Sequence, residues 1–536
     1  MRCIAFVLLL GFFSVVGGRA ETTGSSLPGL PIGPPRPVTV DLRLEKGPLN
    51  RMFQRCVGAG RANEGLRADW QRQLAYARRE CGFQYLRMHG LFCDDMGVYM
   101  EDAKGLPVYN WQYVDELYDY LISIGMKPFV ELGFMPSALA SGKQTIFWWR
   151  GNTTLPKDWQ KWENLVRASV AHWTGRYGEA EVKSWYFEVW NEPNLRGFFD
   201  GTQDDYFKLY SLTARAIKSV NPAYQVGGPA TAGVAWVPEF IAFCAKDNVP
   251  VDFVSTHTYA VAKGFLDEFG NDGTVFSPNP RSIFGEVIDV RRQIRASKRP
   301  DLPLHLTEWS TSYTPRDPIH DSYHSASFIV DRLRRSGNAA DSMSYWVFTD
   351  IFEEAGPRTT PFHGGFGLIN YQGINKPAFY AYQFLNRLGP TELQCDADSA
   401  WVTTDGKGAV QALMWNFTNT HPGNSAINQE FYTRDLPPSK VTPVVLTIRS
   451  LKPGRCALRL FKVGYRVNDA YATYRDLGAP SQLTREQVAY IKSANSGAPV
   501  EQSIVTIGPD GEFSRSFDVR ENDVCLVEIE PLPTQG

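Results

Sequence analysis

This sequence contains few histidines and no cluster of metal-ligating residues, and its positive and negative charges nearly balance. Its 536 residues include eight histidines and no His-Glu-x-x-His motif or clustered carboxylates, so metal-dependent catalysis is poorly supported. The Gly-x-Ser-x-Gly element of a Ser-His-Asp hydrolase is also absent. A net charge of −2, without a basic run, argues against nucleic acid or an anionic membrane as a partner. We therefore expect no metal, no cofactor, no nucleic acid and no membrane partner.

Cysteine and long apolar runs are also limited. With Cys3 set aside, seven of the eight cysteines remain, at loose spacing that indicates neither a disulfide framework nor a metal cluster. The apolar run at residues 4–16 is too short to span a bilayer. Because it follows Arg2 and precedes Gly18-Arg19-Ala20, it is typical of a secretory signal. We expect residues 1–20 to be a signal peptide and the protein to be exported, to the periplasm or the medium.

Aromatic residues, by contrast, are abundant. They make up 13% of the chain, with 14 tryptophans, a composition that suits surfaces stacking against the flat faces of sugar rings. The chain is too long for one ordinary core, so we expect a large domain and a smaller one. The expected divisions are the signal peptide, a Pro-rich linker at 21–37, a strand at 38–48, a large domain at 49–388 and a smaller one at 389–536.

The large domain shows a repeating strand and helix pattern. Trp70, Leu74, Ala77 and Cys81, for example, fall on one helical face that ends at Gly82. Eight apolar segments alternate with such helices, which predicts a (β/α)8 TIM barrel. The expected strands are residues 55–60, 83–90, 127–134, 185–192, 224–229, 251–260, 304–310 and 342–350.

Beyond Gly389-Pro390 the pattern changes to short alternating segments separated by turn residues. Segments such as 400–403, 409–417, 444–448, 456–463 and 524–529 are typical of a β-sandwich, so we expect a C-terminal β-sandwich accessory domain. The early strand, at residues 38–48, is expected to cross back and join this sandwich.

Two carboxylates stand out at the ends of predicted barrel strands, Glu192 and Glu308. Glu192 ends an apolar, aromatic run, and Pro193 is expected to hold it in extended backbone. Glu308 lies in a similar segment after Pro303. Because TIM barrels carry their chemistry at the carboxyl ends of their strands, both groups are expected at one site. Paired carboxylates without metal ligands suit glycosidic bond cleavage, with retention of configuration if they lie about 5–5.5 Å apart.

Further polar and aromatic residues fall at the same strand ends. Taken alone, each has an ordinary structural explanation, but together they favour a sugar-binding site. We expect Asn191 to bind the sugar 2-hydroxyl and Tyr259 to contact the carboxylate of Glu308. His89 and His257 would bind ring hydroxyls, and Trp346 would pack against the sugar ring.

These segments resemble glycoside hydrolase family 39, most closely its bacterial β-xylosidases. The resemblance is carried by residues 187–195 and 305–313, which are similar to the two catalytic signatures of the family. It extends through 87–90, 130–136, 254–259, 345–348 and 362–367. It implies Glu192 as acid/base, Glu308 as nucleophile and a sugar-binding carboxylate within Glu353-Glu354, of which we favour Glu354. An acidic residue there disfavours a substrate carboxylate and so weighs against the iduronidase branch of the family.

The expected function is that of a retaining, exo-acting β-D-xylosidase acting on xylo-oligosaccharides. Two alternatives stay open, namely a glycosidase of the same fold acting on an arabino- or uronic-configured sugar, and a non-catalytic carbohydrate-binding barrel. The sequence does not indicate the number of subunits, or whether the site is a pocket or a cleft.

Overall fold

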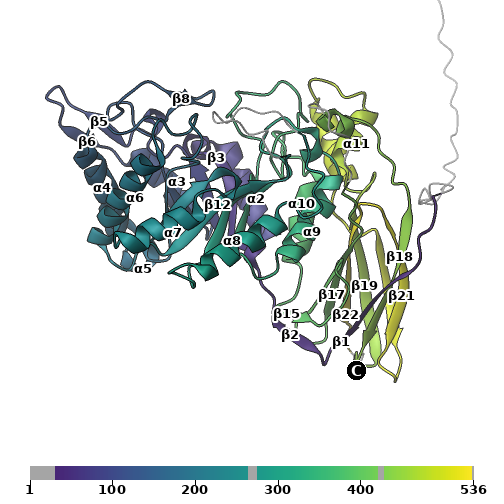
Figure 1. Ribbon diagram of the computed structural model, residues 1–536. Coiled ribbons are helices and arrows are strands. Elements are labelled where there is room, and N and C mark those ends of the chain that lie inside the picture. The colour runs from purple at the N-terminus through teal and green to yellow at the C-terminus, as the bar shows by residue number, and fades with distance from the viewer. Residues whose placement is uncertain (1–29, 263–274, 420–427, 534–536) are drawn as a thin grey trace, which may run out of the picture.

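The computed structural model describes residues 30–262, 275–419 and 428–533, and the expected signal peptide lies outside these ranges. Within them, eight parallel strands close into a barrel in the order β10-β11-β12-β13-β14-β3-β4-β7, which confirms the predicted TIM barrel (Figure 1). The strands are β3 (Cys56–Arg61), β4 (Tyr85–His89), β7 (Lys127–Leu132), β10 (Tyr186–Val189), β11 (Gln225–Thr231), β12 (Phe253–Tyr259), β13 (Leu304–Ser310) and β14 (Ser342–Tyr345).

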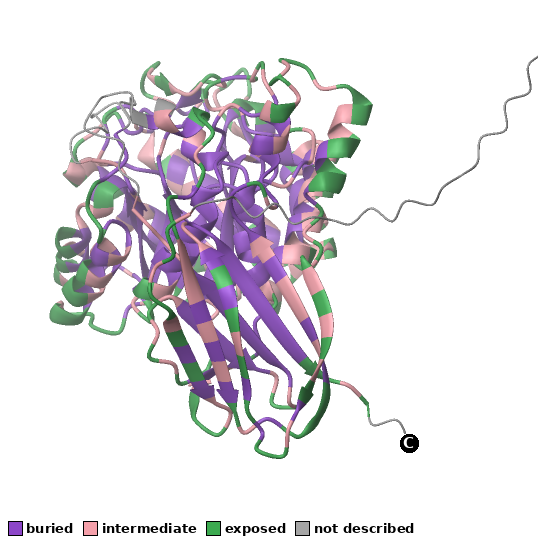
Figure 2. Cartoon of the chain, turned by 90° about the vertical axis from the view of Figure 1, so that its right-hand side faces the viewer, coloured by how far each residue is buried: buried purple, intermediate pink, exposed green. Residues whose placement is uncertain are grey.

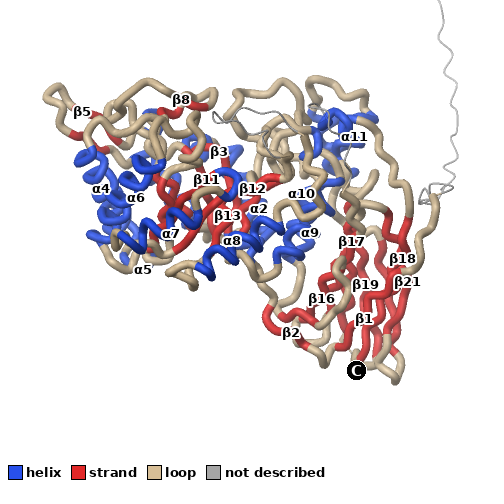
Figure 3. The backbone as a smooth tube through the Cα atoms, in the orientation of Figure 1, coloured by secondary structure: helices blue, strands red, loops and turns tan. Residues whose placement is uncertain are grey.

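Helices surround the barrel strands (Figure 3). Helix α2 (Ala68–Cys81) illustrates why they form: Trp70, Leu74, Ala77 and Cys81 are fully buried along one face, and Gly82, at φ 77°, ends the helix. The others are α1 (Met52–Arg55), α3 (Gln112–Ser123), α4 (Trp159–Tyr177), α5 (Glu179–Val182), α6 (Gln203–Val220), α7 (Val237–Lys246), α8 (Phe284–Ala296), α9 (His324–Ser336) and α10 (Pro377–Asn386). Across the described ranges, no helix combines the length and apolar character that crossing a membrane requires.

Long loops project from the carboxyl ends of the barrel strands. Two of them contain short strand pairs, β5 (Tyr99–Glu101) with β6 (Pro107–Tyr109) and β8 (Thr145–Ile146) with β9 (Gly151–Asn152). Figure 1 shows β5 and β8 at the upper end of the barrel, which is where the strands finish. The loop after β7 contributes Phe147 to the site described below.

The C-terminal part forms two sheets packed face to face, as the sequence predicts. The smaller sheet contains β1 (Arg36–Asp41), β18 (Val441–Arg449) and β21 (Phe513–Arg520). The larger contains β2 (Glu45–Pro48), β15 (Thr391–Leu393), β16 (Ala400–Thr404), β17 (Val410–Trp415), β22 (Val524–Pro531), β19 (Gly454–Val463) and β20 (Glu501–Ile507). Buried residues alternate with partly or fully exposed ones along the strands of the smaller sheet, as Figure 2 shows. The early strand β1 runs parallel to β18, with Val38 opposite Leu446.

The larger sheet packs its second face against the barrel helices α9 and α10. Phe384 of α10 meets Phe461 of β19 with ring centroids 6.1 Å apart, and Arg387 Nε lies 2.8 Å from Glu528 Oε1. Two short helices, α11 (Ala470–Asp476) and α12 (Arg485–Ala494), extend from the sandwich toward the loop end of the barrel (Figure 1). The sandwich thus contributes residues close to the loops that follow β14.

Candidate active site

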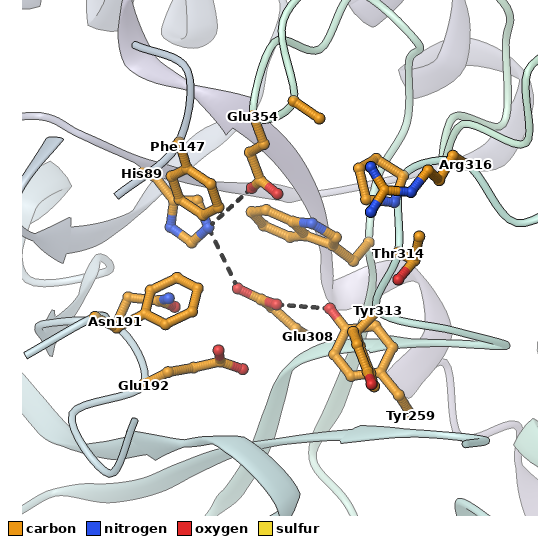
Figure 4. A pocket seen from close by; sticks show the side chains of 14 residues that line it. His89, Phe147, Asn191, Glu192, Tyr259, Glu308, Tyr313, Thr314, Arg316 and Glu354 are labelled. Atoms are coloured by element: carbon orange, nitrogen blue, oxygen red, sulfur yellow. Dashed lines mark hydrogen bonds and ion pairs between the residues drawn. The ribbon is translucent and has the colours of Figure 1, made fainter. Parts of the chain in front are cut away.

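One cavity of about 250 Å³ opens at the carboxyl ends of the barrel strands (Figure 4). It brings together seven of the eight site residues expected from the sequence, with His257 as the exception. The lining residues are His89, Phe147, Asn191, Glu192, Phe198, Tyr259, Glu308, Tyr313, Thr314, Pro315, Arg316, Trp346, Glu354 and Ala355. Glu354 lines this cavity, whereas its neighbour Glu353 binds Arg61 and Arg67 outside it.

The two central carboxylates are close together. One oxygen of Glu192 and one oxygen of Glu308 lie within 4.8 Å of each other. Retaining glycosidases separate their carboxyl groups by about 5–5.5 Å, and inverting ones by about 6.5–9.5 Å to admit a water molecule. The spacing therefore suits direct attack of one carboxylate on the anomeric carbon.

Both oxygens of Glu308 are held by protein donors. Arg87 Nη1 donates to Oε1 at 2.6 Å, and the Tyr259 hydroxyl donates to Oε2 at 2.6 Å. Burial and then the charge of Glu308 raise the pKa of Tyr259, so its hydroxyl remains a donor. Charge-assisted contacts of this kind favour the ionised carboxylate and fix its direction, which is what a nucleophile requires.

Glu192, by contrast, is held in its protonated form. Burial and then the negative charge of Glu308 raise the pKa of Glu192 well above its usual value. The acid must be neutral to donate a proton to a leaving oxygen, so the raised pKa suits Glu192 to that task. The two carboxyl groups thus differ in environment as an acid and a nucleophile should.

His257 supports this protonation state. Thr307 Oγ1 donates to Glu188 Oε1 at 2.7 Å, so it can only accept from His257 Nε2, 3.1 Å away. Burial and then Arg87 hold the pKa of His257 well below its usual value, which leaves the ring neutral with its proton on Nε2. The bare Nδ1 lies 2.8 Å from Glu192 Oε1 and must accept the proton of the Glu192 acid.

This geometry corrects the role expected for His257. The side chain is fully buried, does not line the cavity, and has both ring nitrogens engaged by protein groups. It therefore contacts Glu192 rather than a sugar hydroxyl. We call the series Glu192, His257, Thr307 and Glu188 the His257 chain.

The backbone around Glu192 also differs from expectation. Strand β10 ends at Val189, and Glu192 has φ 45° instead of the extended conformation expected before Pro193. Its N–H donates to the carbonyl of Ala230 in β11 at 2.8 Å. This tertiary hydrogen bond outweighs the local preference set by the proline, and such a conformation costs on the order of 1–3 kcal/mol. Strain of this size is typical of residues placed for chemistry.

The opposite side of the cavity is formed by His89, Trp346 and Glu354. His89 Nδ1 lies 2.6 Å from Glu131 Oε2, while Nε2 lies 3.5 Å from Glu354 Oε1 and 3.6 Å from Glu308 Oε1 (Figure 4). The His89 and Trp346 rings are 4.6 Å apart. Burial and then Glu308 raise the pKa of Glu354, whose carboxyl group points into the cavity. Together, His89, Trp346 and Glu354 offer an aromatic surface and several hydrogen-bonding atoms, a combination that suits a sugar.

A metal ion is a further occupant that this geometry allows in principle. One donor atom each from Glu192, His257 and Glu308 lies within 4.8 Å of the others. However, the guanidinium of Arg87 already contacts Glu308 at 2.6 Å and supplies a positive charge there. Because His257 Nδ1 and Glu192 Oε1 share a proton at 2.8 Å, these groups fit acid chemistry better than metal ligation.

Comparison with known proteins identifies the family. The family model for glycosyl hydrolases family 39 matches residues 37–513. The chain belongs to this family. It is therefore a glycoside hydrolase, and the close carboxylate pair agrees with a retaining one.

The similarity to known proteins extends over nearly the whole of this chain. The chain is 40% identical over 487 residues to a β-xylosidase of Geobacillus stearothermophilus, covering 89% of this chain and 92% of the relative. A crystal structure of a monomeric β-xylosidase from Caulobacter crescentus is 46% identical, with a TM-score of 0.88, and covers 93% of this chain and 100% of that one. A family 39 enzyme from Xanthomonas axonopodis pv. citri is 44% identical, with a TM-score of 0.89 and coverage of 93% and 98%.

Arg87 is the main residue of this family 39 site that sequence reasoning left without a role. It is fully buried, and its guanidinium contacts Glu131, Glu188 and Glu308 at 2.9, 2.6 and 2.6 Å. Burial tends to lower the pKa of Arg87, but the carboxylates outweigh it and raise that pKa well above its usual value. The signal was available, because a charged residue inside an apolar barrel strand must find partners within the barrel.

Arg87 also orients Asn191. Arg87 Nη2 donates to Asn191 Oδ1 at 2.7 Å, which turns the amide so that its NH₂ group remains available to the cavity. Loop residues complete the lining, namely Phe147, Phe198, Tyr313, Thr314, Pro315, Arg316 and Ala355. They follow no periodic pattern, and the sequence gives no signal for their placement.

Proposed function

We propose that this chain is an exo-acting β-D-xylosidase that releases xylose from the non-reducing end of xylo-oligosaccharides. The observation that carries the reaction type is the Glu192–Glu308 pair within 4.8 Å, one member protonated and the other held by Arg87 and Tyr259. The proposed sugar is supported by β-xylosidases at 40% and 46% identity over about nine tenths of the chain.

In the first step Glu308 attacks the anomeric carbon from the face opposite the leaving group. The glycosidic bond breaks as Glu192 transfers its proton to the departing oxygen, which leaves a covalent glycosyl-enzyme ester on Glu308. In the second step the Glu192 carboxylate takes a proton from water, and the water oxygen displaces Glu308. Two inversions give net retention, and Glu192 ends protonated again.

The binding roles follow from which atoms remain available to the cavity. Asn191 offers its amide NH₂ to the 2-hydroxyl, and Trp346 offers a ring surface. Glu354 and His89 Nε2 lie together at 3.5 Å and address hydroxyls farther from the scissile bond. A carboxylate on the sugar would be buried there beside Glu354 and close to the negative charge of Glu308, which disfavours a uronic substrate.

The size of the cavity supports exo action. At about 250 Å³ it is smaller than the roughly 300–1,000 Å³ typical of sites for larger ligands, so it accommodates about one sugar ring. We further propose that the enzyme is exported, because the apolar run at residues 4–16 has the pattern of a secretory signal.

A panel of aryl glycosides tests the proposal. Wild type and Glu308→Ala are compared on β-xyloside, α-arabinoside, β-glucoside and β-glucuronide substrates. We expect the β-xyloside to be hydrolysed fastest, and only by wild type. Faster hydrolysis of another glycoside would contradict the proposed substrate. Activity of Glu308→Ala equal to that of wild type would contradict the assignment of Glu308 as nucleophile.

A further inference from the structure

A second cavity, of about 340 Å³, lies beside the active site but shares no lining residue with it. Its walls come from the loop after β14, from Arg67 near the start of α2, and from the segment between α11 and α12. The residues that matter below are Arg67, Glu353, Tyr371, Gln372 and Gln482. We call this the Tyr371 cavity.

The Tyr371 cavity rests on a packed base. Phe362 and Ile374 of the barrel loop are buried together with Tyr474 of α11 and Ile491 of α12. The rings of Phe362 and Tyr474 are 5.0 Å apart. Because this small core joins the barrel loop to the sandwich helices, the cavity is preformed, as ligand sites usually are.

Tyr371 provides an exposed ring in a fixed orientation. Half of the residue is exposed, at 50%, and its hydroxyl accepts from Arg67 Nη2 at 2.9 Å. Arg67 is fixed in turn by Glu353, which accepts from Arg67 Nη1 at 3.0 Å. An aromatic ring that is exposed yet held in place is what a sugar face requires for stacking.

The two carboxylates that line the Tyr371 cavity, Asp350 and Glu353, are each paired with cations. Glu353 accepts from both Arg61 Nη2 and Arg67 Nη1 at 3.0 Å. Asp350 lies 3.1 Å from Lys376 Nζ and accepts from the Gly367 N–H at 2.7 Å. A charged ligand would have to break these pairs, whereas a neutral polyhydroxyl ligand would not. The amides of Gln372 and Gln482 add the donors and acceptors that hydroxyl groups need.

From these observations we infer that the Tyr371 cavity is a second carbohydrate-binding site, for a neutral oligosaccharide of the kind that the enzyme degrades. The choice of a xylo-oligosaccharide as ligand rests on the proposed function. Glu353 lines this cavity and Glu354 the active site, so adjacent residues of the same loop face the two cavities. If one part of a long oligosaccharide is bound in the Tyr371 cavity, the effective concentration of its other sugar units at Glu192 and Glu308 rises.

The test combines covalent blocking with a binding measurement. Wild type is first treated with a 2-deoxy-2-fluoro-β-xyloside, and the intact mass reports whether the Glu308 ester forms. Saturation-transfer NMR with xylotriose then measures binding to the blocked enzyme. The same measurement is made on Tyr371→Ala, on Gln482→Ala and on the control Tyr490→Ala, whose tyrosine is 55% exposed on α12 and lines neither cavity.

We expect saturation transfer to xylotriose in the blocked wild type and in blocked Tyr490→Ala. In Tyr371→Ala we expect a Kd about tenfold higher than in wild type. No transfer in the blocked wild type, or equal transfer in Tyr371→Ala, would overturn the inference. Gln482→Ala changes an exposed side chain and decides the matter if Tyr371→Ala does not fold. Failure to form the mass adduct counts against the proposed function alone, and the variants are then compared by the same criterion without blocking.

Discussion

His257 Nδ1 lies 2.8 Å from Glu192 Oε1, and because its other ring nitrogen already donates to Thr307, this contact places a proton on Glu192. The same conclusion follows from the raised pKa of Glu192, whose main cause is burial. Two independent properties, hydrogen-bond geometry and desolvation, therefore assign Glu192 as the acid. The nucleophile is then Glu308, which accepts hydrogen bonds from Arg87 and Tyr259.

The first prediction concerns the dependence of activity on pH. Since Glu192 must be protonated in the first step, kcat/KM should fall as pH rises through the raised pKa of Glu192. In Glu192→Gln this alkaline limb should disappear on a dinitrophenyl xyloside, whose leaving group needs no acid. An alkaline limb that persists in Glu192→Gln would assign it to another group.

The second prediction concerns the His257 chain. Nδ1 stabilises the protonated form of Glu192, so His257→Leu should lower the pKa of Glu192 and move the alkaline limb down by about one pH unit. We expect kcat/KM to fall about 10–100-fold at neutral pH. Thr307→Val should shift the limb in the same direction, while Thr307→Ser, which keeps the hydroxyl, should not. If His257→Leu lowers kcat/KM but leaves the alkaline limb at its wild-type pH, the role of His257 is purely structural.

The third prediction separates two adjacent carboxylates. Glu354→Gln replaces the carboxyl group that points into the cavity and should reduce kcat/KM about 10–100-fold, mostly through KM. Glu353→Gln, its control, changes a group bound to Arg61 and Arg67 outside the cavity and should reduce kcat/KM less than about fivefold. Steady-state kinetics on the aryl xyloside measures both. The reverse order would move the sugar contact to Glu353.

The fourth prediction concerns stability. Arg87→Met leaves Glu131, Glu188 and Glu308 buried without their cation and should lower the free energy of unfolding by about 3–5 kcal/mol. Arg87→Lys keeps the charge but loses the branched hydrogen bonding, so we expect an intermediate loss. Urea unfolding provides the measurement, with the exposed Arg43→Met as a control that should unfold like wild type. A wild-type midpoint for Arg87→Met would contradict the account.

The sequence predicts the fold class because hydrophobic periodicity is a local property. The barrel and the sandwich are confirmed, but some expected strands end early, most clearly those at 185–192 and 342–350, which end at Val189 and Tyr345. These final residues leave the strand ladder to build the site, and no local pattern marks that departure. The positive φ of Glu192 likewise accompanies a hydrogen bond to Ala230, which lies on the next barrel strand.

The candidate site divides in the same way. Glu192 and Glu308 are recognisable because each carboxylate ends an apolar segment at the same end of the barrel. The role of His257 is not, since it depends on which partners its two nitrogens meet. Arg87 is an intermediate case: its burial is predictable from its strand, but its contacts with Asn191 and Glu308 require the closed barrel.

The most direct test of the central claim is the configuration of the first product, followed by ¹H NMR during hydrolysis of an aryl β-xyloside by wild type. With Glu308 as nucleophile and Glu192 as acid/base, β-xylose should appear first and the α anomer only later, by mutarotation. If α-xylose forms first, water attacks directly, and the assignment of Glu308 as nucleophile is wrong.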